Sequence, residues 1–311
     1  LGTAFSMLAA GMNGFLNAQG YPGMGMLTTV IGAALNLILD PLFIFKFHLG
    51  VKGAALATVI SQMVSAVWVL RFLTGKKAIL KIRRKNLKPD GRLLLNIMSL
   101  GFSGFIVQFT NALVQIVCNV TLRSYGGDLY VGIMTVLNSV RELLSLPVMG
   151  IVSGSQPILG YNYGAKNFER VKKLYRWMIG MCFGFRFLST ATSMIFPAFY
   201  AGFFTNEAEL VALTGKVMPI FMAGMLVFGL QNGIQPTFLA LGQAKISLFI
   251  AVLRKIILLI PLAIILPHFM GVMGVYWAEP ISDIISATMA SLLFLFNIKK
   301  ILSEESLAKI H

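Results

Sequence analysis

Long apolar runs separated by short polar connections dominate this sequence of 311 residues. A run of roughly 18 or more apolar residues is long enough to cross a bilayer as a helix. In hydrocarbon every backbone N–H and C=O must be satisfied within the protein, which leaves helices or closed barrels. The alternating pattern of barrel strands is absent, so the sequence predicts an all-α, polytopic membrane protein. We place nine spans at residues 1–17, 24–46, 51–73, 96–119, 130–152, 174–200, 214–236, 248–266 and 271–296.

The composition excludes a soluble domain and argues against nucleic acid as a partner. Charged residues are 12% of the chain, whereas a soluble domain carries about a quarter. The formal net charge of +15 comes from bases that lie between apolar spans, with no RNA-binding motif beside them. We therefore expect the lipid bilayer as the partner. Cys118 and Cys182 lie in separate spans without a CxxC pairing, as is typical of buried thiols.

The distribution of Lys and Arg predicts the orientation in the membrane. The connection at 71–92 holds nine of them and the connection at 166–176 holds five. By the positive-inside rule both connections are cytoplasmic, and the C-terminus is then cytoplasmic too. We expect the protein to lie in the plasma (inner) membrane of the cell. Nine spans put the N-terminus outside with no export signal before it. We therefore expect about three further spans before Leu1.

A weak internal repeat supports the same expectation. The spacing of Gly, Ala and Ser over residues 50–61 recurs over residues 271–282, an offset of 221 residues. Internal repeats of this kind are typical of transporters. The repeat predicts two pseudo-symmetric six-helix bundles, of which about nine helices are present in this chain. We divide the chain into residues 1–92, the remainder of an N-terminal lobe with its basic cytoplasmic loop, and residues 93–311, a C-terminal lobe with a cytoplasmic tail.

Asp40 is a carboxylate in the middle of an apolar span. Burying a charge at mid-bilayer costs about 2.5–3.5 kcal/mol on insertion scales, so its default interpretation is functional. Asn36 lies one helical turn earlier, and Thr58 lies at a matching depth on the returning span. Pro41 removes a backbone donor and is expected to bend the helix. These oxygens predict a site for a proton or a sodium ion; the alternative is an Asp that hydrogen-bonds a neighbouring helix.

Other polar side chains inside the spans lead to two further predictions. Lys255 and Asp283 reach similar depths on successive spans, which predicts a structural ion pair. Six side chains are predicted to line a substrate cavity, although they could instead join helices through hydrogen bonds, and Glu142 could be structural. These six are Gln108, Asn111, Gln115, Glu142, Gln231 and Gln235.

The chain resembles the bacterial multidrug branch of the multidrug and toxic compound extrusion (MATE) family along its whole length. Four segments carry the resemblance, and their combination in this order is specific. They are NAQGYP at 17–22, NLILDPLFIF at 36–45, GVKGAALATVISQ at 50–62 and GSQPILGYNYGAKN at 154–167.

The resemblance implies twelve helices in two lobes, so the nine spans would be helices four to twelve. It implies export of small organic compounds, often cationic and aromatic, by alternating access in exchange for a proton or sodium. We expect a monomer without a cofactor and with no metal beyond such a sodium. In one branch of the family the coupling site matches Asn36, Asp40 and Thr58, and its further acid falls outside this chain. Another branch uses acids on the spans 96–119 and 214–236, which carry none here.

Two other functions compete with drug export. A flippase for lipid-linked precursors, from the same superfamily, is the main alternative. An enzyme is not expected, because the spans hold no GxGD or HExxH motif and no Ser/His pair.

Overall fold

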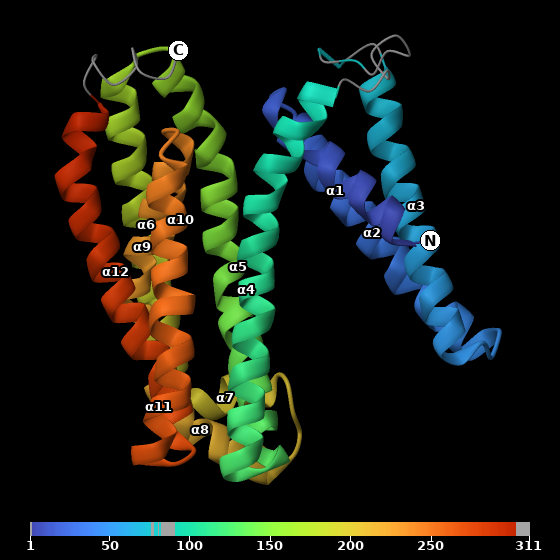
Figure 1. Cartoon of the computed structure of the whole chain (residues 1–311). Helices are drawn as coiled ribbons and strands as arrows, with labels where there is room; N and C mark the ends of the chain where they lie inside the picture. Colours follow the sequence, from blue (N-terminus) through green and yellow to red (C-terminus); the bar gives the residue numbers. More distant parts are fainter. Residues whose placement is uncertain (1, 76–77, 80, 82–90, 303–311) are drawn as a thin grey trace. The chain divides into compact units, whose positions relative to one another are not determined.

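The part of the chain that the structure describes is almost entirely helical. The computed structural model describes residues 2–75, 78, 79, 81 and 91–302, and no strand occurs in these ranges. The chain divides into two compact units, Leu1–Asn96 and Ile97–His311. Figure 1 draws the helices of both units.

The first unit is built on three long helical segments. These are α1 (Gly2–Ala18), α2 (Pro22–Pro41) with the π-helical turn η1 (Leu42–Lys46), and α3 (Gly50–Thr74). The α2 helix packs along α3, and α1 packs against both. Small side chains let α2 and α3 approach: the Ser65 hydroxyl donates a 3.1 Å hydrogen bond to the Thr28 carbonyl. Leu16, Val69 and Leu73 form a small buried cluster.

The second unit contains the longer helices. Its elements are α4 (Gly91–Gly126, which begins in the first unit), α5 (Asp128–Gly164), α6 (Phe168–Ile195), α7 (Pro197–Gly202), α8 (Ala208–Met222), α9 (Met225–Ala240), α10 (Ala244–Val252), the π-helical turn η3 (Leu253–Leu259), α11 (Ile260–Met270) and α12 (Met273–Ile301). Helices α6 and α9 pack together, and α12 packs against α9, η3 and α11 (Figure 1).

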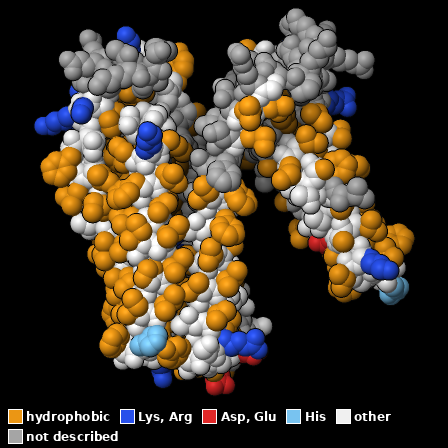
Figure 2. All heavy atoms as spheres, viewed as in Figure 1, with side chains coloured by type: hydrophobic (Ala, Val, Ile, Leu, Met, Phe, Trp, Pro, Cys, Tyr) orange, Lys and Arg blue, Asp and Glu red, His pale blue; other side chains and the backbone are white. Residues whose placement is uncertain are grey.

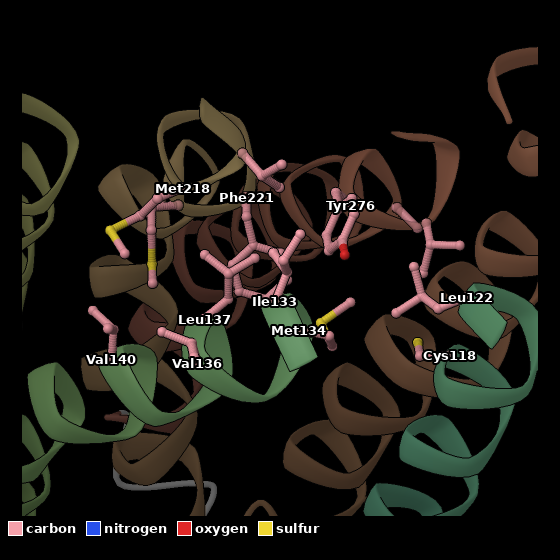
Figure 3. Packing of buried hydrophobic residues seen from close by; sticks show 14 of the residues in the cluster. Cys118, Leu122, Ile133, Met134, Val136, Leu137, Val140, Met218, Phe221 and Tyr276 are labelled. Carbon is pink, nitrogen blue, oxygen red and sulfur yellow. The ribbon is translucent and has the colours of Figure 1, made fainter. Parts of the chain in front are cut away.

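Two apolar clusters fill the second unit. The first joins α4, α5, α8 and α12, and Figure 3 shows Leu137, Phe221 and Tyr276 from three of these helices in one cluster. The second cluster joins α5, α6, α9, α10 and α12 around residues such as Phe238. The same helices also carry the charged side chains of the second unit that are described below.

Most of the predicted spans coincide with helices that can cross a membrane. Six described helical segments are long and apolar enough, and the pair α8 and α9, bent by 51° at its break, makes a seventh if it is one span. The predicted spans 1–17 and 96–119 lie on α1 and α4, which are not among those segments of the described chain. The α1 helix has only 17 residues. The α5 helix continues through Pro147 and Pro157 to Gly164, beyond the predicted end at 152.

Apolar side chains cover the outside of the helices. Leu37, Val51 and Phe296 are each at least three-quarters exposed. Figure 2 shows hydrophobic side chains over the flanks of the visible face of each unit. Continuous apolar surface is rare on soluble monomers, so these flanks are suited to lipid.

Helices α6 and α9 approach closely at a Gly-xxx-Gly pair, a pattern that brings membrane helices together. A Cβ added at Gly233 would lie 2.7 Å from the Ile179 Cα, and one at Gly229 would lie 2.9 Å from the Phe183 Cα. Both contacts are with backbone of α6, which cannot yield as a side chain can. The separation of these two helices therefore depends on both glycines.

Gly233→Val is expected to destabilise the protein by about 1–3 kcal/mol, because the new side chain must push α9 away from α6. The measurement is thermal unfolding of the detergent-solubilised protein. Gly184→Val on α6 is the matched control, since a Cβ there meets nothing within 4 Å. Equal losses of stability in the two variants would contradict the close packing at Gly233.

Candidate functional site

The first unit brings Asn36, Asp40 and Thr58 together. The Asn36 side-chain amide donates to the Asp40 Oδ1 at 3.3 Å and to the Thr58 Oγ1 at 3.5 Å. The Thr58 hydroxyl itself donates to the Ala54 carbonyl at 3.0 Å. One amide therefore bridges a carboxylate on α2 and a hydroxyl on α3. The sequence predicted that these three residues converge, and their role in coupling stays a prediction.

A polar cavity of about 360 Å³ lies beside this cluster within the first unit. Asn36 and Thr58 line it, together with side chains that the sequence analysis did not assign to a site, among them Asn13 and Ser61. The Asn13 Oδ1 and the Ser61 Oγ are buried and have no hydrogen-bond partner among the described residues. Such oxygens suit a hard cation or water. The sequence did show polar residues within apolar spans. Whether their side chains point into a cavity depends on how the helices pack, which the sequence does not show.

The backbone after Pro41 is unusual. Helix α2 does not stop at Pro41 but widens into the turn η1, where the Phe47 amide donates to the Leu42 carbonyl at 3.1 Å. Single π-helical turns are rare and often occur at functional sites. The structure thus places a change of helical winding directly beside Asp40. The predicted bend at Pro41 stays a prediction.

The second unit buries a cluster of four charges. Asp283, which is fully buried, accepts from the Arg141 Nη2 at 2.8 Å and from the Arg254 Nε at 2.6 Å. Glu279 accepts from Arg141 and, at 3.1 Å, from the Arg254 Nη2. Two guanidinium groups from α5 and η3 therefore bridge two carboxylates on α12. Each buried charge has a counterion and directed hydrogen bonds, which is the condition for burying it.

This cluster corrects the predicted ion pair between Lys255 and Asp283. Lys255 forms no ion pair with any residue in the described ranges, and Asp283 is paired with Arg141 and Arg254 instead. Neighbouring residues on a helix point in different directions, so Arg254 faces α12 where Lys255 does not. A guanidinium also presents several donors in a planar fork, which suits two carboxylates better than an ammonium does.

Aromatic rings complete the surroundings of the cluster. The Arg254 Cζ lies 4.5 Å from the centroid of the Phe228 ring, and the Arg141 Cζ lies 5.8 Å from the rings of Phe228 and Phe221. Rings at these distances favour the cationic groups electrostatically.

A cavity of about 700 Å³ opens onto this cluster within the second unit. Of the six predicted cavity residues, Asn111, Gln115 and Glu142 line it. Arg141, Arg186, Arg254, Lys255 and Glu279 line it too. Sequence reasoning did not assign Arg141, Arg186 or Arg254 to the cavity. Each of these arginines stands out in the sequence as a base inside an apolar run. The residues that surround it lie on helices distant in the sequence, so its place in the cavity could not be predicted.

The other three predicted cavity residues do not line this cavity. Gln231 accepts from Ser286 on α12 and donates to Gln235 at 3.3 Å, and Gln235 donates to the Ser247 carbonyl at 3.2 Å. These two glutamines therefore join helices, which was the alternative interpretation of polar residues in the spans. Gln108 is exposed and accepts from Asn111 at 2.7 Å.

Comparison with known proteins yields one consistent set of relatives. The MatE family matches residues 104–265. The multidrug export protein MepA of Staphylococcus aureus (strain NCTC 8325 / PS 47) is 28% identical over 296 residues, covering 94% of this chain and 64% of that protein. MepA of Staphylococcus saprophyticus subsp. saprophyticus is 26% identical over 302 residues. The chain thus spans 64% of the length of these curated relatives.

Solved structures show the same fold. A MATE protein crystallised in complex with MaL6 superposes with a TM-score of 0.86 at 23% identity, covering 94% of this chain and 67% of that one. The outward-facing conformation of a MATE multidrug resistance transporter superposes with a TM-score of 0.84 at 24% identity, covering 93% and 65%. The predicted all-α, multi-pass membrane fold is confirmed.

Arg254→Gln is expected to destabilise the protein by about 3–5 kcal/mol, because it leaves the buried Asp283 and Glu279 with one cation between them. Lys255→Gln is the matched control on the same turn and should change stability little. Thermal unfolding of the purified protein measures both. A larger loss in Lys255→Gln than in Arg254→Gln would contradict the arrangement of the cluster.

Proposed function

Because the chain belongs to the MatE family, as its sequence resemblance predicts, we propose that it acts as a secondary active multidrug exporter. It exchanges small organic compounds, often cationic and aromatic, for a proton or a sodium ion by alternating access. Its curated relatives are multidrug export proteins, which supports transport rather than enzymatic activity.

The contact between Asn36, Asp40 and Thr58 is the main support for coupling of transport to a proton or a sodium ion. The Asp40 carboxylate is held by an amide inside an apolar helix that packs along α3. Protonation or cation binding at Asp40 weakens the charge-assisted hydrogen bond from Asn36. The amide that bridges α2 to α3 then changes partners. A ligand that binds one packing of these helices better than the other shifts their equilibrium, which is the basis of coupling.

The backbone beside Asp40 supports the same role. Pro41 donates no hydrogen bond, so a carbonyl in the preceding turn lacks its usual helical donor. A sodium ion there would draw on the Asp40 carboxylate, the Asn36 amide oxygen and the Thr58 hydroxyl together with backbone oxygen. A proton needs the carboxylate alone.

The cavity in the second unit is the proposed site for the exported compound. Its volume of about 700 Å³ lies within the range of roughly 300–1,000 Å³ for sites that take drug-sized ligands. Phe228, Met134 and Met149 supply an apolar and adaptable wall, and the polar side chains of Asn111 and Gln115 supply hydrogen bonds.

The orientation and organisation of the chain complete the proposal. Arg170, Lys173 and Arg176 are exposed at the start of α6, as expected of a basic segment at an anionic cytoplasmic surface. We place the protein in the plasma membrane as a monomer with a cytoplasmic C-terminus. Residues 1–92 then belong to one lobe and residues 93–311 to the other.

Asp40→Asn is expected to abolish resistance and dye efflux in cells that lack their own drug pumps, because the amide cannot take up and release a proton and lacks the charge for sodium. Minimum inhibitory concentrations and ethidium efflux measure the loss, with membrane content checked by immunoblot. Asp128→Asn is the matched control, since that carboxylate is exposed and pairs only with Arg123 in the described chain.

Full efflux by Asp40→Asn would contradict the coupling role. Absence of dye efflux in the unaltered protein, together with transport of a polyprenyl-linked lipid, would favour the flippase instead.

A further inference from the structure

The cavity of the second unit carries more positive than negative charge. Four bases line it, and three carboxylates line or adjoin it. The bases are Arg141, Arg186, Arg254 and Lys255, and the carboxylates are Glu142, Glu279 and Asp283. Arg141 and Arg254 are paired with both buried carboxylates. The remaining bases are therefore Arg186 and Lys255, against one remaining carboxylate, Glu142, which is exposed.

Arg186 is the most deeply buried of these bases. It is only 3% exposed, although its side chain lines the cavity from α6. Its Nη2 donates to the Ser145 hydroxyl at 2.9 Å, and that hydroxyl donates to the Arg141 carbonyl at 2.6 Å. The Nε and Nη1 of Arg186 have no hydrogen-bond partner in the part of the chain that the structure describes. A neutral hydroxyl thus positions the guanidinium, and no carboxylate among the described residues forms an ion pair with it.

A buried cation with unpaired donors is costly unless an acceptor reaches those donors. The Nε and Nη1 atoms together carry three N–H groups. A carboxylate has the charge and the planar pair of acceptors that a guanidinium binds best. Lys255 lines the same cavity without an ion pair among the described residues, and it can supply a second positive group.

We propose that Arg186, assisted by Lys255, binds the carboxylate of a monoanionic or zwitterionic organic compound in this cavity. A single negative charge matches the excess of one base over the carboxylates. The apolar body of the ligand lies against Phe228 and Met149, which line the same space. This inference rests on the proposed function, because the cavity is the one assigned to the exported compound. It narrows that compound to one that carries a carboxylate, in place of the purely cationic compounds that the family resemblance implies.

The experiment compares two ligands of the same shape on the purified full chain in nanodiscs. Isothermal titration calorimetry measures 2-naphthoate, which carries a carboxylate, and 2-naphthamide, which is neutral. The unaltered protein should bind the naphthoate at least about tenfold more tightly, as expected of hydrogen bonds to a charged group. Arg186→Gln should remove that preference while leaving the amide's affinity unchanged. Arg176→Gln, an exposed base on the same helix, is the matched control and should keep the preference.

Equal affinities for the two ligands in the unaltered protein would overturn the proposal, as would a naphthoate preference that survives in Arg186→Gln. The comparison in the unaltered protein decides the matter even if Arg186→Gln does not fold. Binding is measured without any ion gradient. A failure here therefore leaves the efflux test at Asp40 unaffected, and a failure of that test leaves this one unaffected.

Discussion

Charged side chains inside these helices need hydrogen bonds or counter-charges from the protein or from a ligand, because hydrocarbon offers neither water nor counterions. The second unit meets this constraint with two guanidinium groups that bridge two carboxylates on α12. That arrangement ties α5, η3 and α12 to one another, and Arg141, Arg254 and Glu279 line the large cavity. Two apolar clusters, one of them drawn in Figure 3, also hold α5 and α12. The cavity is therefore lined by members of the ionic cluster together with apolar and neutral polar side chains.

The first unit meets the same constraint differently. Asp40 has no cationic partner among the described residues and is held by the Asn36 amide alone. Asp283, by contrast, forms ion pairs with two arginines. This contrast agrees with the coupling role that we propose for Asp40 and with a structural role for Asp283.

The sequence alone predicted the contacts that depend on local geometry. Asn36 and Asp40 are one turn apart on a single helix, and Thr58 follows through a short turn, so equal depth was enough to bring them together. The partners of Asp283 depend on how α5 and η3 are rotated against α12, which no local pattern records. The π-helical turns η1 and η3 add an extra residue to a helical turn, and this shifts the faces that follow. The rotation of α9 against its neighbours is also not recorded in any local pattern. The sequence therefore could not distinguish Gln231 and Gln235, which join helices, from residues that line the cavity.

The most direct test of the account is exchange in proteoliposomes that contain only the purified protein. An outward-directed movement of an aromatic drug should require an inward proton or sodium gradient, and an imposed drug gradient should in turn drive the same cation in the opposite direction. Drug movement that is unchanged when both cation gradients are collapsed would contradict the account.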